Sequence, residues 1–341
     1  MRRLSFIVIL FFIFQGSQAR SFGKYLKVEK DSAFVKKYRN SLIIRLYSGE
    51  KSHTLQLSDL NSNYSLKYLP NGYTNLGIGV NFRSFGLSLA TKIPLWQMSE
   101  IRHGETSRFG IQSYIYTIKF SVDLLSSFLR GYYLVNSADH ISGYSKKIEY
   151  QRKDISSANI GITVNYIFNN KRFSYRAAFS DTERQLKSAG SLLAGGSVIS
   201  YQTHADSSLV PREIKSQFFS KSRDISKTGV IAFNATIGYA YSLVFFKNGI
   251  FTVSYVVGTG LQENRFDREV NEEINRWRFS INHTGRIGIG YRFNRYYLRF
   301  GVIRSTQYTN LRYNDLGIGN GTNFMQVSLG KRFDLKKKKQ K

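Results

Sequence analysis

The sequence contains no cysteine and only three prolines. Without thiols, the protein can have no disulfide bond, no thiolate metal site and no cysteine nucleophile. Beyond its first residues the sequence also has no apolar run long enough to cross a bilayer as a helix, and its mean hydropathy is −0.30. These absences argue against a disulfide-rich domain and against a helical membrane protein.

Acidic residues are scarce, with 22 Asp and Glu against 50 Lys and Arg, which gives a formal net charge of +28. Such a balance favours anionic partners, which include nucleic acid, anionic lipid and small anionic solutes. The basic residues are spread along the chain without an RNA-binding or DNA-binding motif. We therefore expect no nucleic-acid partner.

The first residues have the pattern of a secretory signal peptide. Arg2 and Arg3 precede an apolar run over 4–14, and Ser17 and Ala19 supply the small residues of a cleavage site. A buried core helix would explain neither the paired arginines nor the position at the start. The pattern predicts a cleaved signal peptide over 1–19, and the lack of a following cysteine excludes a lipoprotein anchor.

Aromatic residues and glycine are abundant, with 23 Tyr, 26 Phe and 28 Gly, as is typical of β-barrels with aromatic girdles. Apolar and polar residues alternate repeatedly from 41 to 333. Over 278–293, one face carries Phe279 and Ile287, whereas the other carries Asn282 and Arg286. Alternation of this kind predicts strands with two different environments, long enough here to cross a membrane at a tilt.

Short and long connections alternate along the chain, as in outer-membrane barrels with tight periplasmic turns and long outer loops. The short turns fall near 83–84, 124–127, 169–171, 247–249 and 294, and the longer stretches are 94–108, 136–157, 181–228, 262–277 and 307–322. We therefore predict an all-β fold, a transmembrane antiparallel β-barrel of about twelve strands with both termini periplasmic. The expected strands are 41–47, 73–82, 85–93, 109–120, 128–136, 158–168, 172–180, 229–242, 250–261, 278–293, 295–306 and 323–333. A fourteen-stranded alternative would add 54–59 and 192–201, the second of which we otherwise place in the longest outer loop.

Two features agree with this register. Expected outward positions beside the short turns are aromatic, which predicts an interfacial girdle: Phe82, Phe85, Phe120, Phe168, Phe173, Tyr239, Tyr241, Phe251, Tyr291, Phe293 and Tyr296. No Asp or Glu falls inside an expected strand. The domain plan is a periplasmic N-terminal segment over 20–40, a barrel over 41–333 and a basic tail over 334–341.

Several stretches in a fixed order resemble an uncharacterised outer-membrane barrel family of the Bacteroidota, a domain-of-unknown-function family numbered four-four-two-one. The matching stretches are residues 42–47, 68–71, 75–79, 187–191, 238–241 and 331–333. The resemblance covers nearly the whole mature chain and implies integral insertion in a bacterial outer membrane. It implies contact with the lipids there and with the barrel-insertion machinery. It brings no activity, ligand, cofactor or catalytic residue to carry over.

The candidate functional residues are the basic side chains expected to face the lumen: Arg45, Lys92, Lys119, Arg130, Arg176, Arg278, Arg286, Arg299 and Arg332. Without inward acids, their charge would need water or anions as solvation. This favours a pore with a basic, anion-favouring lumen. The alternative is a filled barrel with a structural or surface-interaction role.

A lipid hydrolase or acyltransferase is the third possibility. It would need a histidine beside a serine or an acid, but four of the five histidines, His53, His103, His140 and His204, are expected in loops or near turns, and His283 on the lipid face. There is no G-x-S-x-G motif. We expect neither a metal nor a cofactor.

One stretch, 262–277, holds five acids: Glu263, Asp267, Glu269, Glu272 and Glu273. Interleaved arginines make a solvated loop a better interpretation than a calcium site. A loop of this length could instead fold into the barrel, where Arg278 and Arg286 would be the nearest basic partners. The sequence leaves these two arrangements open.

Overall fold

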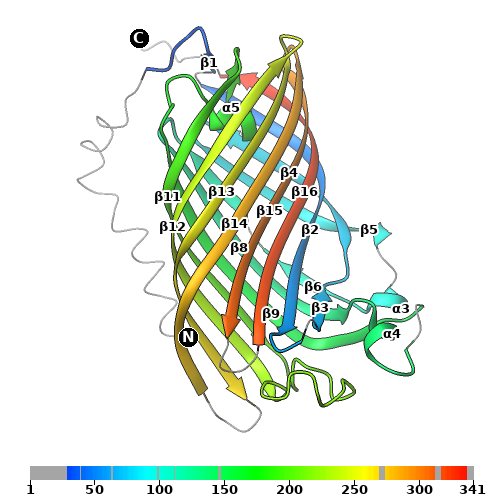
Figure 1. Ribbon diagram of the computed structural model, residues 1–341. Coiled ribbons are helices and arrows are strands. Elements are labelled where there is room, and N and C mark those ends of the chain that lie inside the picture. Colours follow the sequence, from blue (N-terminus) through cyan, green and yellow to red (C-terminus); the bar gives the residue numbers. More distant parts are fainter. Residues whose placement is uncertain are drawn as a thin grey trace, which may run out of the picture.

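The structure is a computed structural model that describes residues 29–335, except 39, 63, 98–99, 111, 145–146, 269–272 and 312–315. The predicted signal peptide and most of the predicted basic tail lie outside the described residues. Twelve antiparallel strands form a closed ring, because the last strand pairs with the first of the ring. The predicted twelve-stranded transmembrane β-barrel is therefore confirmed (Figure 1).

The strands follow one another around the ring in chain order. They are β2 (Ser41–Asp59), β4 (Tyr73–Phe82), β5 (Phe85–Gln97), β7 (Gln112–Tyr116), β8 (Phe120–Leu134), β9 (Tyr150–Ile167), β11 (Ala189–His204), β12 (Ile225–Phe245), β13 (Gly249–Arg268), β14 (Glu273–Phe293), β15 (Tyr296–Leu311) and β16 (Leu316–Asp334). Two further short strands, β3 (Ser65–Leu69) and β6 (Ser107–Phe109), also pair with β8. In the chain, β3 comes between β2 and β4, and β6 comes between β5 and β7.

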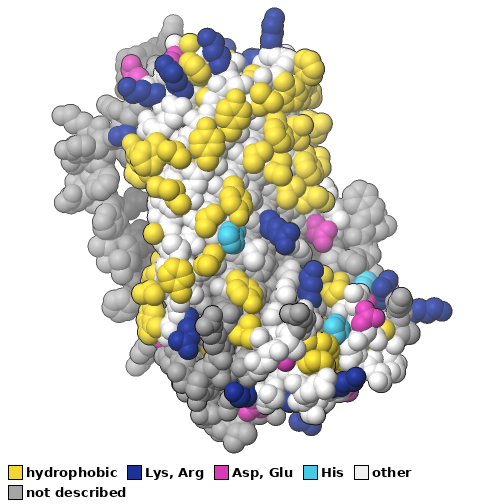
Figure 2. All heavy atoms as spheres, viewed as in Figure 1, with side chains coloured by type: hydrophobic (Ala, Val, Ile, Leu, Met, Phe, Trp, Pro, Cys, Tyr) yellow, Lys and Arg dark blue, Asp and Glu magenta, His cyan; other side chains and the backbone are white. Residues whose placement is uncertain are grey.

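The outer face of the wall is apolar at alternate positions of most strands. Leu89, Ile237 and Leu298 are examples of large hydrophobic side chains exposed there. Figure 2 shows hydrophobic side chains spread over the wall, with Lys and Arg toward both ends. Pairing around the ring satisfies most of the backbone hydrogen bonds of the wall, as a sheet that spans lipid requires.

The predicted aromatic girdle is confirmed for most of its members. Phe85, Phe168, Tyr239, Tyr291 and Tyr296 are among the exposed aromatic residues close to the short turns. Aromatic rings at this level suit the interface between hydrocarbon and headgroups. Phe173 is the exception, because it is fully buried inside the barrel.

One expected strand of the wall is wrong. In place of a strand over 172–180, the chain forms a short helix, α5 (Tyr175–Phe179), whose N-cap Ser174 accepts a hydrogen bond from the backbone N of Ala177. Its place in the ring is taken by β11, which contains the stretch 192–201 that we assigned to an outer loop. The count of twelve stands, but the fourteen-stranded alternative does not, since 54–59 continues β2.

The predicted turn at 124–127 is also wrong. The chain turns at 117–119, where the Thr117 hydroxyl accepts a hydrogen bond from the Phe120 backbone N at 2.8 Å. As a consequence, Asp123 lies inside β8. Glu50 in β2 and Asp154 in β9 also lie in strands, so the expectation of acid-free strands is wrong.

The connection between β9 and β11 folds into the barrel at the end with the short turns. Residues 168–188, which include α5 and β10 (Glu183–Gln185), join residues 29–38, whose strand β1 (Val35–Lys37) pairs with β10. We call these two segments the plug. Figure 1 shows α5 and β1 at this end of the barrel.

The opposite end is covered by residues 205–224, the connection between β11 and β12, which we call the cap. Leu209, Val210 and Phe219 of the cap are buried in a hydrophobic cluster with side chains of the surrounding strands, such as Leu55 and Ile318. Two helical turns, α3 (Glu100–His103) and α4 (Ser137–His140), lie in neighbouring connections at this end. No helix within the described residues is long and apolar enough to cross a membrane.

Candidate functional site: a basic chamber between plug and cap

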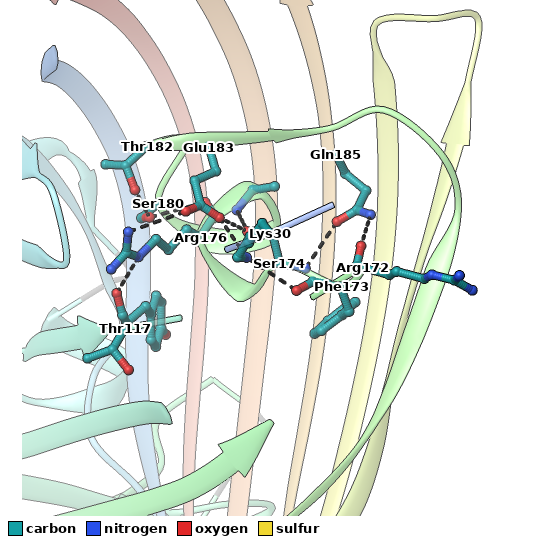
Figure 3. A network of polar contacts seen from close by, with 12 residues as sticks. Lys30, Thr117, Arg172, Phe173, Ser174, Arg176, Ser180, Thr182, Glu183 and Gln185 are labelled. Carbon is teal, nitrogen blue, oxygen red and sulfur yellow. Dashed lines mark hydrogen bonds and ion pairs between the residues drawn. The ribbon is translucent and has the colours of Figure 1, made fainter. Parts of the chain in front are cut away.

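The plug is held together by a buried carboxylate with several donors. Figure 3 shows Lys30, Ser174 and Arg176 gathered around Glu183. Lys30 Nζ lies 2.7 Å from Glu183 Oε2, Ser174 Oγ donates to the same oxygen at 2.5 Å, and Arg176 Nη1 lies 3.3 Å from Oε1. Since Lys30 and Glu183 are almost fully buried, this ion pair fastens the N-terminal segment to the rest of the plug.

The charged groups of this cluster shift one another's pKa values. Burial alone would raise the pKa of Glu183, but Lys30 and Arg176 more than offset it, and the pKa of Glu183 lies below its usual range. Burial lowers the pKa of Lys30, although Glu183 acts in the opposite direction. At neutral pH Glu183 therefore stays ionised and keeps its donors in place.

A second carboxylate fixes the plug to the wall. Asp181 accepts two hydrogen bonds from Arg299 on β15, from Nε at 2.9 Å and from Nη2 at 2.5 Å. Arg292 on β14 approaches the same carboxylate at 3.3 Å. Arg299 also donates to the carbonyl oxygens of Ala177 and Ala178 in α5.

The wall itself carries a third pair that crosses the lumen. Arg286 on β14 donates from its two terminal nitrogens to both oxygens of Asp123 on β8, at 2.9 and 2.8 Å. Tyr116 donates to Asp123 as well, at 2.9 Å. A bidentate pair of this kind is both directional and strong in a buried site. It neutralises one of the predicted inward charges, which the sequence had left unmatched.

Between the plug and the cap lies a chamber of about 650 Å³. Its polar lining includes Arg45 and Lys51 from β2 and Arg108 from β6, and Phe179 of the plug helix forms part of its apolar lining. This volume falls within the roughly 300–1,000 Å³ of ordinary small-molecule sites. The chamber is therefore the candidate functional site.

Two glycines of β4 make room for the side chains of β2 in this chamber. A β-carbon at Gly79 would lie 2.4 Å from Arg45 Nε, and one at Gly77 would lie 2.4 Å from the ring of Tyr47. Both side chains thus lie flat across the neighbouring strand, which places the Arg45 guanidinium 5.4 Å from the centre of the Tyr47 ring. Gly77 and Gly79 are required because the Tyr47 and Arg45 side chains approach the backbone of β4 too closely for a β-carbon.

Arg45 is only 5% exposed, yet no described carboxylate forms an ion pair with it. Its Nη2 donates to Ser88 Oγ at 2.6 Å, while its Nε has no partner among the described residues. Lys51 Nζ donates to the Ser126 carbonyl at 3.4 Å, and Arg108 donates to the carbonyl of Lys51. Glu105, an exposed residue, is the one acid in the described chamber lining. The chamber is consequently basic.

The predicted lumen-facing residues divide into separate groups. Arg45 and Arg299 line the chamber, while Arg286 is buried in its pair with Asp123. Arg176 lies on the plug helix instead of a wall strand. Lys119 lies in the turn before β8, Arg130 is exposed, Arg278 is half-buried, and Arg332 pairs with Asp334 at 3.2 Å. The side chain of Lys92 lies outside the described residues.

The expected loop over 262–277 is largely strand, because β13 and β14 remain paired from Gln262 and Arg278 to Asp267 and Glu273. Its described acids find local partners: Glu263 pairs with Arg265 at 3.0 Å, and Asp267 pairs with Lys227 at 3.1 Å. Glu269, Glu272 and the side chain of Glu273 lie outside the described residues. The carboxylate that meets Arg286 is Asp123, so the structure differs from the arrangement in which this loop enters the lumen.

The sequence did not identify Lys51 and Arg108 as residues of the lumen. Lys51 was placed beyond the end of a shorter strand, and Arg108 in a loop, whereas both lie in strands. His53 was likewise expected in a loop, but it is buried in β2, where its Nδ1 lies 3.0 Å from the Tyr132 hydroxyl. Among the described residues, no group of three His, Asp or Glu side chains is placed to hold a metal ion.

The geometry defines a class of membrane protein: a barrel closed by an internal plug and an outer cap, with a basic chamber between them. The chain matches, over residues 29–333, the family described as a domain of unknown function, DUF4421. It belongs to that family, and the resemblance noted in the sequence is confirmed. No curated protein matches the chain.

Several solved structures are similar in outline, at low identity. The outer-membrane protease OmpT of Escherichia coli has 10% identity and a TM-score of 0.34, covering 90% of this chain and 99% of its own. The β domain of the Bordetella autotransporter BrkA has 10% identity and a TM-score of 0.36, covering 86% and 99%. The Pseudomonas putida toluene transporter TodX has 9% identity and a TM-score of 0.28, covering 87% and 91%.

Proposed function

We propose that this protein is an integral barrel of a bacterial outer membrane whose chamber binds small anionic solutes and passes them when the plug moves. The observation that carries the proposal is Arg45. Its guanidinium is buried in the chamber wall, and none of the ion pairs of the described residues gives it a carboxylate. A buried cation without a counter-charge is costly, so a bound anion would relieve a real penalty.

The surroundings of Arg45 suit an anion of limited size. Lys51 and Arg108 add two further cations to the chamber lining, and Ser88, Tyr114 and Gln326 add groups that can donate hydrogen bonds. Charge-assisted bonds of this kind contribute about 1.5–3 kcal/mol each. A carboxylate or phosphate of modest size is the chemistry that such a lining recognises.

Passage would require movement, because the plug and the cap obstruct opposite ends of the barrel. The plug is the better candidate for the moving part, since the ion pairs of Asp181 with Arg299 and Arg292 attach it to the wall. The cap is instead embedded in a hydrophobic cluster. The open anion pore expected from the sequence is thus replaced by a chamber that stays closed until the plug moves.

Calorimetric titration of the full-length protein in detergent with butyrate tests the binding step. We expect butyrate to bind, and butylammonium, its cationic counterpart, not to bind. Arg45→Gln and Lys51→Gln should each weaken butyrate binding roughly tenfold, the equivalent of about 1.4 kcal/mol. Arg278→Gln, which removes a wall arginine outside the chamber lining, is the matched control.

The second candidate is a filled barrel with a structural or surface-interaction role. The observation that favours it is the obstruction of both ends by plug and cap. If butyrate binds neither to the unchanged protein nor to any variant, the chamber has no anion-binding role. The filled barrel is then the function that the structure supports.

A further inference from the structure

The ring closes through the short strand β7, which leaves part of one edge of β5 unpaired among the described residues. β5 pairs with β4 along its length, but on its other side it pairs with β7 only at Phe85, Gly86 and Leu87. β6, the next element toward the cap, pairs with β8 instead. Along Ser88–Thr91, therefore, β5 has no ladder on that side among the described residues. Figure 1 shows β5 diverging from the barrel above β6.

This open edge has a topological cause. Near the cap, β3 pairs with both β2 and β8 and so links them directly. The strands β4 to β7 are thereby excluded from the ring at that level. β5 separates from the neighbouring wall as it runs toward the cap. An unpaired edge facing hydrocarbon is unfavourable unless something covers or solvates it.

The gap lies at the level of the apolar outer face. Outward side chains on both sides of the β4–β5 pairing are exposed and apolar, with Leu89 opposite Ile78 and Leu87 opposite Val80. Leu89 is 70% exposed and Phe109 of β6 is 65% exposed. Both nevertheless line the same chamber as Arg45 and Lys51. The chamber thus reaches the lipid-facing surface through the gap.

We infer that the chamber takes a single-chain anionic amphiphile that enters sideways from the bilayer through the gap between β5 and β6. The inference rests on the anion-binding role proposed above and names the ligand class. The head, a carboxylate or a phosphate, lies against Arg45 and Lys51. The alkyl chain runs past Phe324 and Ala90 toward Leu89 at the gap, where it covers the open edge of β5.

The polarity of the lining follows this direction. Arg45, Lys51 and Arg108 belong to β2 and β6, and the fourth cation of the lining, Arg299, is paired with Asp181. Apolar Ile303, Phe324 and Leu89 line the chamber from other strands. A short carboxylate would use only the first part of the site. A longer chain gains affinity because it removes apolar surface from water.

The test compares chain lengths in full-length protein embedded in lipid nanodiscs. Butyrate and dodecanoate present the same head with different chains, and dodecyl phosphate tests the phosphate head. We expect dodecanoate to bind at least tenfold more tightly than butyrate. Ala90→Trp, which narrows the gap, should abolish that difference, whereas Ala194→Trp on the fully paired part of the wall should preserve it.

A second measurement does not depend on a bulky substitution. Since the chain has no cysteine, Ala90→Cys creates a unique thiol in the chamber lining. Dodecanoate should protect this thiol from maleimide, butyrate should not, and Ala194→Cys should react at the same rate with or without dodecanoate. Protection of neither thiol, with equal affinities for both chain lengths, would overturn lateral entry while butyrate binding stands. Absence of butyrate binding would instead overturn the anion-binding role itself.

Discussion

Arg299 on β15 and Asp181 in the plug are joined by two hydrogen bonds, of 2.9 and 2.5 Å, and both side chains are about 95% buried or more. This relationship connects the membrane wall to the segment that obstructs the lumen. The two residues are 118 positions apart in the sequence. It also gives the plug a single point at which its attachment can be tested.

Asp181→Asn should loosen the plug. The substitution leaves Arg299 buried without its counter-charge and weakens the contact of Arg292, at a cost on the order of 3–5 kcal/mol. Planar-bilayer recordings should show channel openings that the unchanged protein lacks, together with faster proteolysis within residues 168–188. Asp31→Asn is the control, because Asp31 lies in the plug but forms a longer, exposed pair with Arg172 at 3.7 Å. If both variants stay closed, Asp181 does not hold the plug.

Acid should release the plug through Glu183. The pKa of Glu183 in the folded protein is lowered from the ordinary 4.5, so its contribution to stability is present above that pH. It is lost as the pH falls through the lowered value. Conductance or proteolysis of the plug should therefore change below pH 4.5 and stay constant between pH 5 and 8. Glu183→Gln should loosen the plug at neutral pH and remove this acid transition.

The assignment of the two wall faces can be tested by placing an arginine on each. Ile237→Arg introduces a charge at an outward position of β12 that is 66% exposed and should cost about 2–4 kcal/mol near the bilayer midplane. Gln326→Arg places the same charge in the chamber and should cost far less. Asn282 is unsuitable as the inward control, because it is 4% exposed and donates to Ser197. Urea unfolding in lipid vesicles measures both free energies, and equal losses would mean that the faces are reversed.

Gly79→Val should weaken anion binding more than it weakens the fold. A side chain at this position would displace the Arg45 side chain, which is flexible, before it met any backbone atom. Butyrate affinity should drop to a level similar to that of Arg45→Gln, while the urea midpoint changes little. Gly301→Ala is the matched control in the same chamber, since a β-carbon there has no neighbour closer than 3.8 Å. An unchanged affinity in Gly79→Val would show that Arg45 does not bind the anion.

The exchange of two segments shows where period-two patterning fails. Residues 172–180 were expected to be a strand, but they contain α5, and most of them are buried inside the barrel. Residues 192–201 alternate, but we assigned them to an outer loop because a wall strand there would have broken the alternation of short and long connections. Alternation reports that a segment has two environments. It does not report whether the segment lies in the wall or inside it.

The sequence by itself determined the barrel, the number of its strands, the apolar outer face and most of the aromatic girdle. These features depend on alternation and on residues close in the chain, which local pattern records directly. The ion pairs of Asp123 and Asp181, the plug and the open edge of β5 were decided only by the tertiary structure. Each depends on contacts between residues far apart in sequence, such as the 163 positions between Arg286 and Asp123. Closing the ring brings these residues together, so their charges are matched only in three dimensions.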